Sequence, residues 1–253
     1  MPADVLFATV MGSLRAFGLL LALPSLSANG IPPILRAALA LLLGGLVASA
    51  LPPSGVPLVG GWSVLFLAAI HEMLLGLAMG FVVRSVLSIA ELMGRLIAGE
   101  VGLSAAPGFN VPVPSQEPLP AFVGLFGGLL FFLMHAQESV LAAFARSFVL
   151  APAGVGGFSA AAGPTLVTAV ARLLELAVRM AAPFIALNFV ITLGFSILGR
   201  AVPKMNVFVV SYAMRSMLGL LLLAGAGGLI ARYLSGAFNE LPWQMLRLVL
   251  PRH

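Results

Sequence analysis

The residue types that carry enzymatic chemistry are sparse in this chain and stand far apart. His71 and Glu72 match the first half of the zinc-binding pattern His-Glu-x-x-His, but Leu75 occupies the place of the second histidine. The other histidines, His135 and His253, are remote in sequence, and the chain has no cysteine. Neither a phosphate-binding P-loop nor a Gly-x-Ser-x-Gly nucleophile turn occurs. We therefore expect no enzymatic activity, no cofactor and no metal site.

Charged residues instead punctuate apolar segments, which favours a structural role in contacts between helices. Only 8% of the residues are charged and 61% are hydrophobic, and a charged side chain that faces lipid is costly. Glu91 and Arg95 stand four residues apart, a spacing that allows an ion pair along a helix. Glu175 has two candidate partners on neighbouring turns, Arg172 and Arg179. We expect an inter-helix charge network of Arg15, Arg84, Glu91, Arg95, Glu100, Arg172, Glu175, Arg179 and Arg200.

A proline-rich stretch, residues 107–120, interrupts the apolar sequence near its middle. The four prolines after Asn110 exclude a regular helix, because each lacks an N–H and restricts the residue before it. Its apolar side chains include Phe109, Val111 and Val113, which a loop in water does not need. The residues alone leave two interpretations open: a segment that fills a hole, or an ordinary connector packed on its own helices.

Long apolar segments surround this stretch and indicate an all-α integral membrane protein. About six are expected, over residues 5–23, 34–51, 62–106, 121–149, 165–200 and 207–233. The third is too long for a bilayer core of about 30 Å if it is one helix. It is therefore either a helical hairpin or a helix that extends beyond the membrane. We expect several kinked helices, with a bend at Pro183, and an amphipathic tail from Leu234 onward.

Single polar and small residues in these segments predict contacts between helices. Gly-x-x-x-Gly patterns at positions 76–80 and 124–128 let helices approach closely. Asn188 stands alone in an apolar run and is expected to hydrogen-bond another helix. His135 is expected to be a hydrogen-bonded residue within a helix contact. The net charge is +5, but the basic residues are scattered singly, so no nucleic-acid partner is expected.

Several runs spread along the chain carry a shared pattern. They are Arg15 with Leu23-Pro24, Ile31-Pro32 and Arg36; Ala98-Gly-Glu-Val-Gly-Leu-Ser104; Val111-Pro112-Val113 with Gln116; Arg146-Ser147-Phe148 with Pro152 and Gly154; and Ala182-Pro183-Phe184, followed by Gly194, Leu198 and Arg200-Ala-Val-Pro203-Lys-Met-Asn206-Val-Phe208. Together, and in this order, they resemble the FliR/SctT family of type III export-gate proteins. The resemblance covers nearly the whole chain.

The resemblance implies a place in an assembly. One copy would complete a ring of FliP-type subunits, with FliQ-type small subunits outside and an FlhB-type switch protein as a further partner. The helices would form a helical, conical assembly in the bacterial inner membrane at the flagellar basal body, much of it raised to the periplasmic side. The cargo would be unfolded export substrates. The chain would form one membrane-associated domain, residues 1–253, with residues 107–120 as its central plug loop.

In the family, this central loop projects into the pore and acts as a plug. Carried over to this sequence, the pore plug comprises Gly108, Phe109, Asn110, Val111, Pro112, Val113, Pro114, Ser115 and Gln116. The Val-Pro-Val…Gln character of the loop favours a flagellar system over an injectisome.

Two alternatives stay open beside a flagellar export-gate subunit. The first is an injectisome export subunit of the SctT type. The second is a polytopic secondary transporter with a site built on Glu72, Glu91 and Glu100. Transporters usually show internal repeats with broken helices at matching positions, and Pro183 has no counterpart in the first half.

Overall fold

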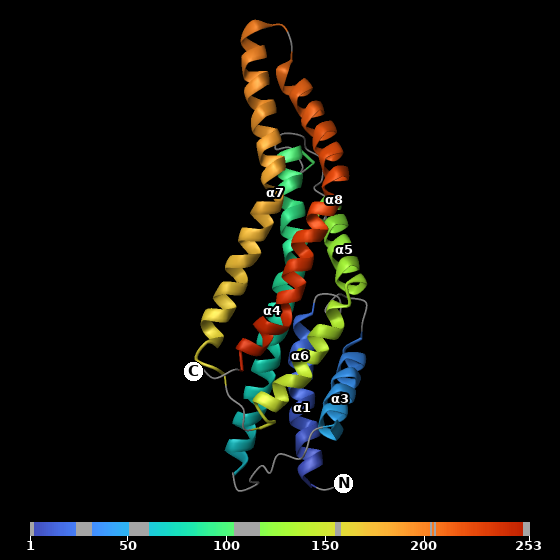
Figure 1. Cartoon of the computed structure of the whole chain (residues 1–253), viewed down its shortest axis with the longest axis vertical. Coiled ribbons are helices and arrows are strands. Elements are labelled where there is room, and N and C mark those ends of the chain that lie inside the picture. Colours follow the sequence, from blue (N-terminus) through green and yellow to red (C-terminus); the bar gives the residue numbers. More distant parts are fainter. Residues whose placement is uncertain are drawn as a thin grey trace. The chain divides into compact units, whose positions relative to one another are not determined.

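The computed structural model describes residues 3–23, 32–50, 61–103, 117–154, 158–202, 204 and 206–249. Within these ranges the regular structure is entirely helical (Figure 1). The helices are α1 (Ala3–Ala22), α3 (Pro33–Ala50), α4 (Trp62–Val101), α5 (Pro118–Leu133), α6 (Ala136–Leu150), α7 (Ala162–Ala201) and α8 (Val207–Arg247). The expectation of an all-α membrane protein with about six long apolar helices is confirmed.

The chain divides into two compact units. Unit 1 comprises Met1–Val86, His135–Val170 and Asn239–His253, and unit 2 comprises Leu87–Met134 and Ala171–Phe238. Unit 1 therefore holds α1, α3, α6 and the first part of α4. Unit 2 holds α5, the remainder of α4 and most of α7 and α8.

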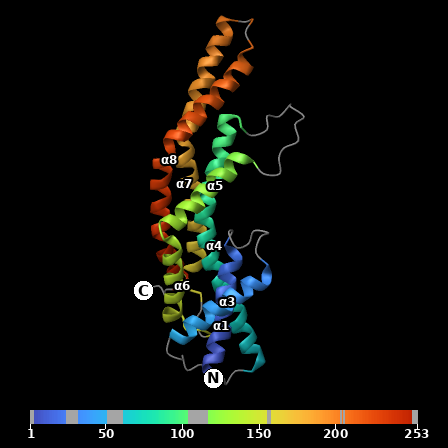
Figure 2. The same cartoon turned by 90° about the vertical axis from the view of Figure 1, so that its right-hand side faces the viewer.

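Helix α1 packs closely against α4 within unit 1. A Cβ at Gly76 would overlap the carbonyl of Arg15, and a Cβ at Gly80 would lie 2.6 Å from the Cβ of Ala22. Later residues of α1 thus meet later residues of α4, so the two helices run in the same direction. The Gly-x-x-x-Gly pattern at 76–80 therefore allows α1 and α4 to approach closely, as expected from the sequence. Figures 1 and 2 both show α3 beside α1, and a Cβ at Gly44 of α3 would overlap Ser13 of α1.

Unit 2 is built on an antiparallel hairpin of α7 and α8, drawn in yellow to red in Figures 1 and 2. Helix α5 packs on α4 in the same unit, where a Cβ at Gly94 would lie 2.7 Å from the Cα of Pro120. A Cβ at Gly124 would lie 2.7 Å from Cγ of Glu91, whereas Gly128 has no atom within 4 Å of that position. Of the second Gly-x-x-x-Gly pattern, Gly124 alone lies in such a contact.

Helix α4 is continuous over 40 residues. At 1.5 Å per residue it is about 60 Å long, roughly twice a bilayer core. Of the two forms open to this segment, the structure has the single long helix and not the hairpin. It ends at Val101, and Gly102 follows with a φ of 78°.

The fourth apolar segment, in contrast, is broken. Residues 121–149 were expected to form one helix, but α5 ends at Leu133 and α6 begins at Ala136, with a bend of 66° between them. His135 has a φ of 55° in the left-handed region, and its Nδ1 lies 2.9 Å from Glu138 Oε1. The side chain of His135 is 72% exposed, so the expected role in a helix contact is wrong.

Five helices, α1, α3, α4, α7 and α8, have the length and hydropathy to cross a membrane, and the bent α5–α6 pair could supply a sixth span. Pro183 lies inside α7 and Pro242 inside α8. The amphipathic tail expected from Leu234 is not a separate element, because α8 runs through it to Arg247.

Candidate functional site

Arg15 of α1 and Glu72 of α4 form a buried ion pair in unit 1. Arg15 Nε lies 2.6 Å from Glu72 Oε2, and Nη2 lies 2.9 Å from Oε1, so the guanidinium contacts both carboxylate oxygens. The side chains are 0% and 2% exposed. The Arg15 guanidinium carbon also lies 4.0 Å from the centre of the Phe148 ring, a cation–π contact.

The remaining polar atoms of this pair are bonded to α6 and to the turn after it. Arg15 Nη1 donates to Ser147 Oγ at 3.0 Å, and Nη2 donates to the carbonyl of Ala151 at 3.0 Å. The backbone N–H of Gly154 donates to Glu72 Oε1 at 2.8 Å, and Gly154 has a φ of 81° that favours glycine. A buried ion pair is tolerated when its other donors and acceptors are satisfied in this way. The cluster therefore joins α1, α4 and α6.

Sequence reasoning placed Arg15 in a charge network but left Glu72 out, because no basic residue stands one helical turn from Glu72. The two are 57 positions apart, and only the fold brings them together. The available signal was that each is a charge in an apolar helix without a local partner. Because both oxygens of Glu72 are engaged, the geometry is that of a structural pair rather than of a proton relay.

A second set of polar contacts joins three helices in unit 2. Asn188 Nδ2 of α7 donates to Glu100 Oε2 of α4 at 2.5 Å, so the expected bond from Asn188 to another helix is confirmed. One turn further along α7, Thr192 Oγ1 accepts from Arg215 Nη2 of α8 at 3.2 Å. Thr192 and Arg215 were not singled out from the sequence. Their pairing depends on the register of the α7–α8 hairpin, which the sequence pattern does not reveal.

The C-terminal end of α4 is held by side chains of α8. The last carbonyls of a helix have no partner within the helix. Here the carbonyl of Val101 accepts from Ser216 Oγ at 3.0 Å, and the carbonyl of Gly102 accepts a hydrogen bond from the Tyr212 hydroxyl. The side chain of Val101 lies where a Cβ of Gly219 would be, so α8 approaches closely at this point. These contacts fix the residues that precede the proline-rich stretch.

The residues that follow this stretch are fixed as well. Helix α5 begins at Pro118, so the last three residues of the expected loop form its first turn, where proline is tolerated. A cavity of about 280 Å³ lies between this turn and α4, lined by Ala98, Leu103, Glu117, Pro118, Leu119, Pro120 and Phe122. The nine candidate plug residues, 108–116, lie outside the described residues.

The other members of the expected charge network do not join one cluster. Arg15 and Arg84 belong to unit 1, and the other seven belong to unit 2. Glu175 pairs with Arg179, one of its two candidate partners, at 2.6 Å on the surface. Glu91 and Arg95 are exposed, and no ion pair joins them. The side chains of Arg84, Arg172 and Arg200 are also exposed.

Within the part of the chain that the structure describes, no group of three or more histidine, aspartate or glutamate side chains is arranged to hold a metal ion. His71 lies against the residues that precede α7, where the backbone N–H of Phe158 donates to its Nε2 at 3.4 Å. The polar clusters thus bind helices and turns to one another.

Comparison with known proteins extends these observations. Residues 6–241 match the family described as bacterial export proteins, family 1. The chain is 27% identical over 228 residues to the flagellar biosynthetic protein FliR of Caulobacter vibrioides, a match that covers 90% of this chain and 91% of the relative. It is 26% identical over 234 residues to the protein of that name from Escherichia coli, with 90% and 87% covered. The match to the Aquifex aeolicus protein of that name is 26% over 172 residues and covers 68% and 67%.

Proposed function

The chain belongs to the bacterial export proteins, family 1, and from this membership we propose that it is a core subunit of the flagellar type III export gate. The single observation that carries the proposal is the match over residues 6–241, with relatives named as flagellar biosynthetic proteins along about 90% of the chain. In this role the chain completes a ring of FliP-type subunits, with FliQ-type and FlhB-type proteins as further partners. It works in the bacterial inner membrane at the flagellar basal body, with much of the assembly raised to the periplasmic side.

Residues 108–116 close the pore of this gate until an unfolded substrate passes. Apolar groups that fill a constriction exclude water and thereby block ions, and Phe109, Val111 and Val113 supply such groups. A plug needs fixed attachment points. The bonds of Tyr212 and Ser216 to the end of α4 support one of them, and the close packing of Pro120 on Gly94 supports the other.

The inter-helix charges take part in assembly. Two exposed members of the set in unit 2, Glu91 and Arg95, meet charges on neighbouring subunits. The buried member Arg15, with its partner Glu72 from outside the set, holds unit 1 together before assembly. Catalysis has no part in the proposed function, since the family is described by export and the relatives are named for flagellar biosynthesis.

Native mass spectrometry tests the proposed membership of the complex. The chain is produced with its FliP-type and FliQ-type partners and extracted in mild detergent. We expect one defined complex that contains a single copy of this chain. A monomer or homodimer that binds neither partner would overturn the proposal and favour a transporter.

Deletion of residues 108–116 tests the plug. The deletion should leave the complex assembled but permeable to ions and small molecules, because the segment fills a pore and does not hold helices together. A Gly/Ser segment of equal length serves as the matched control for chain connectivity, and it should leak as well. Loss of assembly without a leak in the remaining complexes would show that the segment is an ordinary connector.

A further inference from the structure

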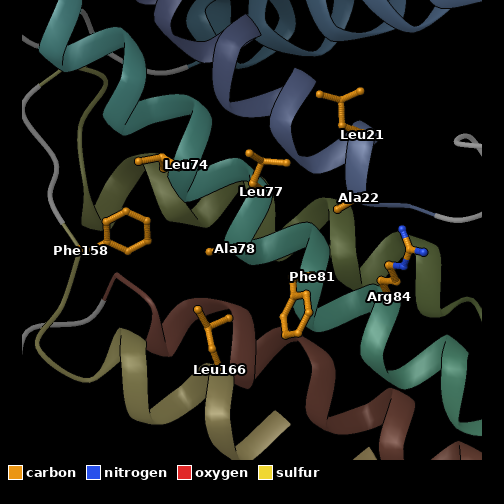
Figure 3. Close-up of a pocket in the computed structure, with 9 residues that line it drawn as sticks. All are labelled: Leu21, Ala22, Leu74, Leu77, Ala78, Phe81, Arg84, Phe158 and Leu166. Carbon is orange, nitrogen blue, oxygen red and sulfur yellow. The ribbon is translucent and has the colours of Figure 1, made fainter. Parts of the chain in front are cut away.

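An apolar groove runs along one face of α4 in unit 1. Its volume is about 620 Å³, within the range of about 300–1,000 Å³ that is usual for small-molecule sites. Leu74 and Arg84 of α4 mark its extent along the helix, and the ten residues between these positions rise about 15 Å. Figure 3 shows Phe158 near one end and Arg84 at the other. The groove is lined by Leu21, Ala22, Leu74, Leu77, Ala78, Phe81, Arg84, Phe158 and Leu166.

Among the described residues that line the groove, Arg84 alone carries a charge. Its side chain is exposed, and within the described ranges it takes part in no ion pair or hydrogen bond. The groove therefore combines a long apolar wall with a single cation at its end. This combination matches a ligand that has an apolar chain and an anionic head.

The position of Arg84 along α4 agrees with a membrane boundary. Trp62 begins α4 and is 90% exposed. The 22 residues from Trp62 to Arg84 rise about 33 Å, close to the thickness of a bilayer core of about 30 Å. Tryptophan and arginine are both typical of membrane–water interfaces. If Trp62 lies at one interface, Arg84 lies at the other, and the groove extends from Arg84 into the hydrocarbon layer.

We propose that this groove binds one acyl chain of an anionic phospholipid, whose phosphate contacts the guanidinium of Arg84. A basic pocket between transmembrane helices is a known way to recognise an anionic headgroup. The acyl chain lies along Ala78, Leu77 and Leu74, towards Phe158. A partner helix would cover the same apolar wall but needs no anion at this end. All nine lining residues belong to unit 1.

Native mass spectrometry with defined lipids tests the headgroup. The full chain, purified and stripped of lipid in mild detergent, is titrated with phosphatidylglycerol and with neutral phosphatidylcholine. We expect tighter binding of phosphatidylglycerol, and a loss of about fivefold in Arg84→Gln. Arg146→Gln is the matched control, because Arg146 is exposed in the same unit but does not line the groove. An equal loss in both variants, or no preference in the unaltered chain, would overturn the proposal.

Two further variants test the acyl chain. Leu166→Trp narrows the groove. It should weaken the binding of both phosphatidylglycerol and phosphatidylcholine and leave the melting temperature of the protein unchanged. A photo-crosslinking phenylalanine analogue at Phe81, which is 39% exposed, should attach to lipid in the assembled complex. Capture of a partner chain by this analogue would show that the groove is a protein interface and would overturn the lipid site.

Discussion

At the scale of single residues, the Arg15–Glu72 pair joins the helices of unit 1. Taking two charges out of water is expensive, and their attraction offsets that cost only when every remaining polar atom is also bonded. Ser147, Ala151 and Gly154 provide those bonds. A change in one partner therefore affects α1, α4 and α6 together.

Glu72→Gln should destabilise the protein strongly. The amide keeps the shape of the carboxylate but leaves the Arg15 charge buried and unpaired, a situation that typically costs about 3–5 kcal/mol. We expect a lower yield and a lower melting temperature in detergent. Glu175→Gln is the matched control, since it breaks the exposed pair with Arg179, and exposed pairs contribute about 0–1 kcal/mol. Equal melting of the two variants would mean that water reaches Arg15.

Which charges pair across the fold could be predicted from the sequence only in part. Glu175 and Arg179 stand four residues apart on one helix, so their spacing proposes the pair that forms, beside Arg172 as a second candidate partner. The same spacing in Glu91 and Arg95 gives no pair, because a helix leaves exposed side chains free to point elsewhere. Arg15 and Glu72 have no local spacing to reveal them.

At the scale of elements, the break between α5 and α6 is the feature that the sequence hides. No proline or glycine marks it, and polar residues such as His135 and Glu138 do not by themselves signal a break, since His71 and Glu72 stand within the continuous helix α4. Helix α4 shows the opposite case, because the absence of any turn signal in residues 62–101 agrees with a single helix. The single long helix was thus predictable as one of two forms, beside a hairpin. The break was not, because it depends on the backbone conformation of one residue, His135.

Substitutions at His135 should separate backbone strain from side-chain bonding. His135→Gly and His135→Val both lose the contact with Glu138, but only valine resists the left-handed conformation. We expect the valine variant to be less stable than the glycine variant by about 1–2 kcal/mol, measured by thermal melting in detergent. Equal stability would show that the bend does not require this conformation.

The close crossing of α1 and α4 yields a prediction on packing. Gly76→Leu should prevent the approach, because even a Cβ at this position overlaps the backbone of Arg15. Little folded protein should remain after detergent extraction, as measured by size-exclusion chromatography. Gly128→Leu, on α5, meets no atom within 4 Å at its Cβ and should leave the yield of the chain unchanged. A normal elution profile for Gly76→Leu would contradict this helix contact.

At the scale of the whole molecule, the long helices bury unequal shares of their surface. The apolar window of α4 is 61% buried within the chain, whereas those of α7 and α8 are 17% and 11% buried. Val190, Leu193 and Leu221 are examples of large apolar side chains left exposed. Surfaces of this kind need lipid or partner subunits to cover them, which agrees with a subunit of a membrane assembly. The composition alone predicted this class of protein, but not which helices stay uncovered.

Cysteine labelling can map this uncovered surface, since the chain has no native cysteine. Leu221→Cys should react slowly with a water-soluble maleimide in the membrane and quickly after denaturation, because lipid or a partner covers α8. Lys204→Cys, between α7 and α8, should react quickly in both states. Equal rates for the two variants in the membrane would show that α8 faces water.

The sequence separation within the buried ion pair has a consequence for biosynthesis. Arg15 emerges from the ribosome 57 residues before Glu72, which corresponds to about 3–11 seconds at 5–20 residues per second. Ser147 follows only after 132 residues. During this interval α1 carries an unpaired cation that opposes its insertion into lipid. The first helix therefore reaches its full stability in the membrane only after the third described helix has arrived, so this step is timed by translation.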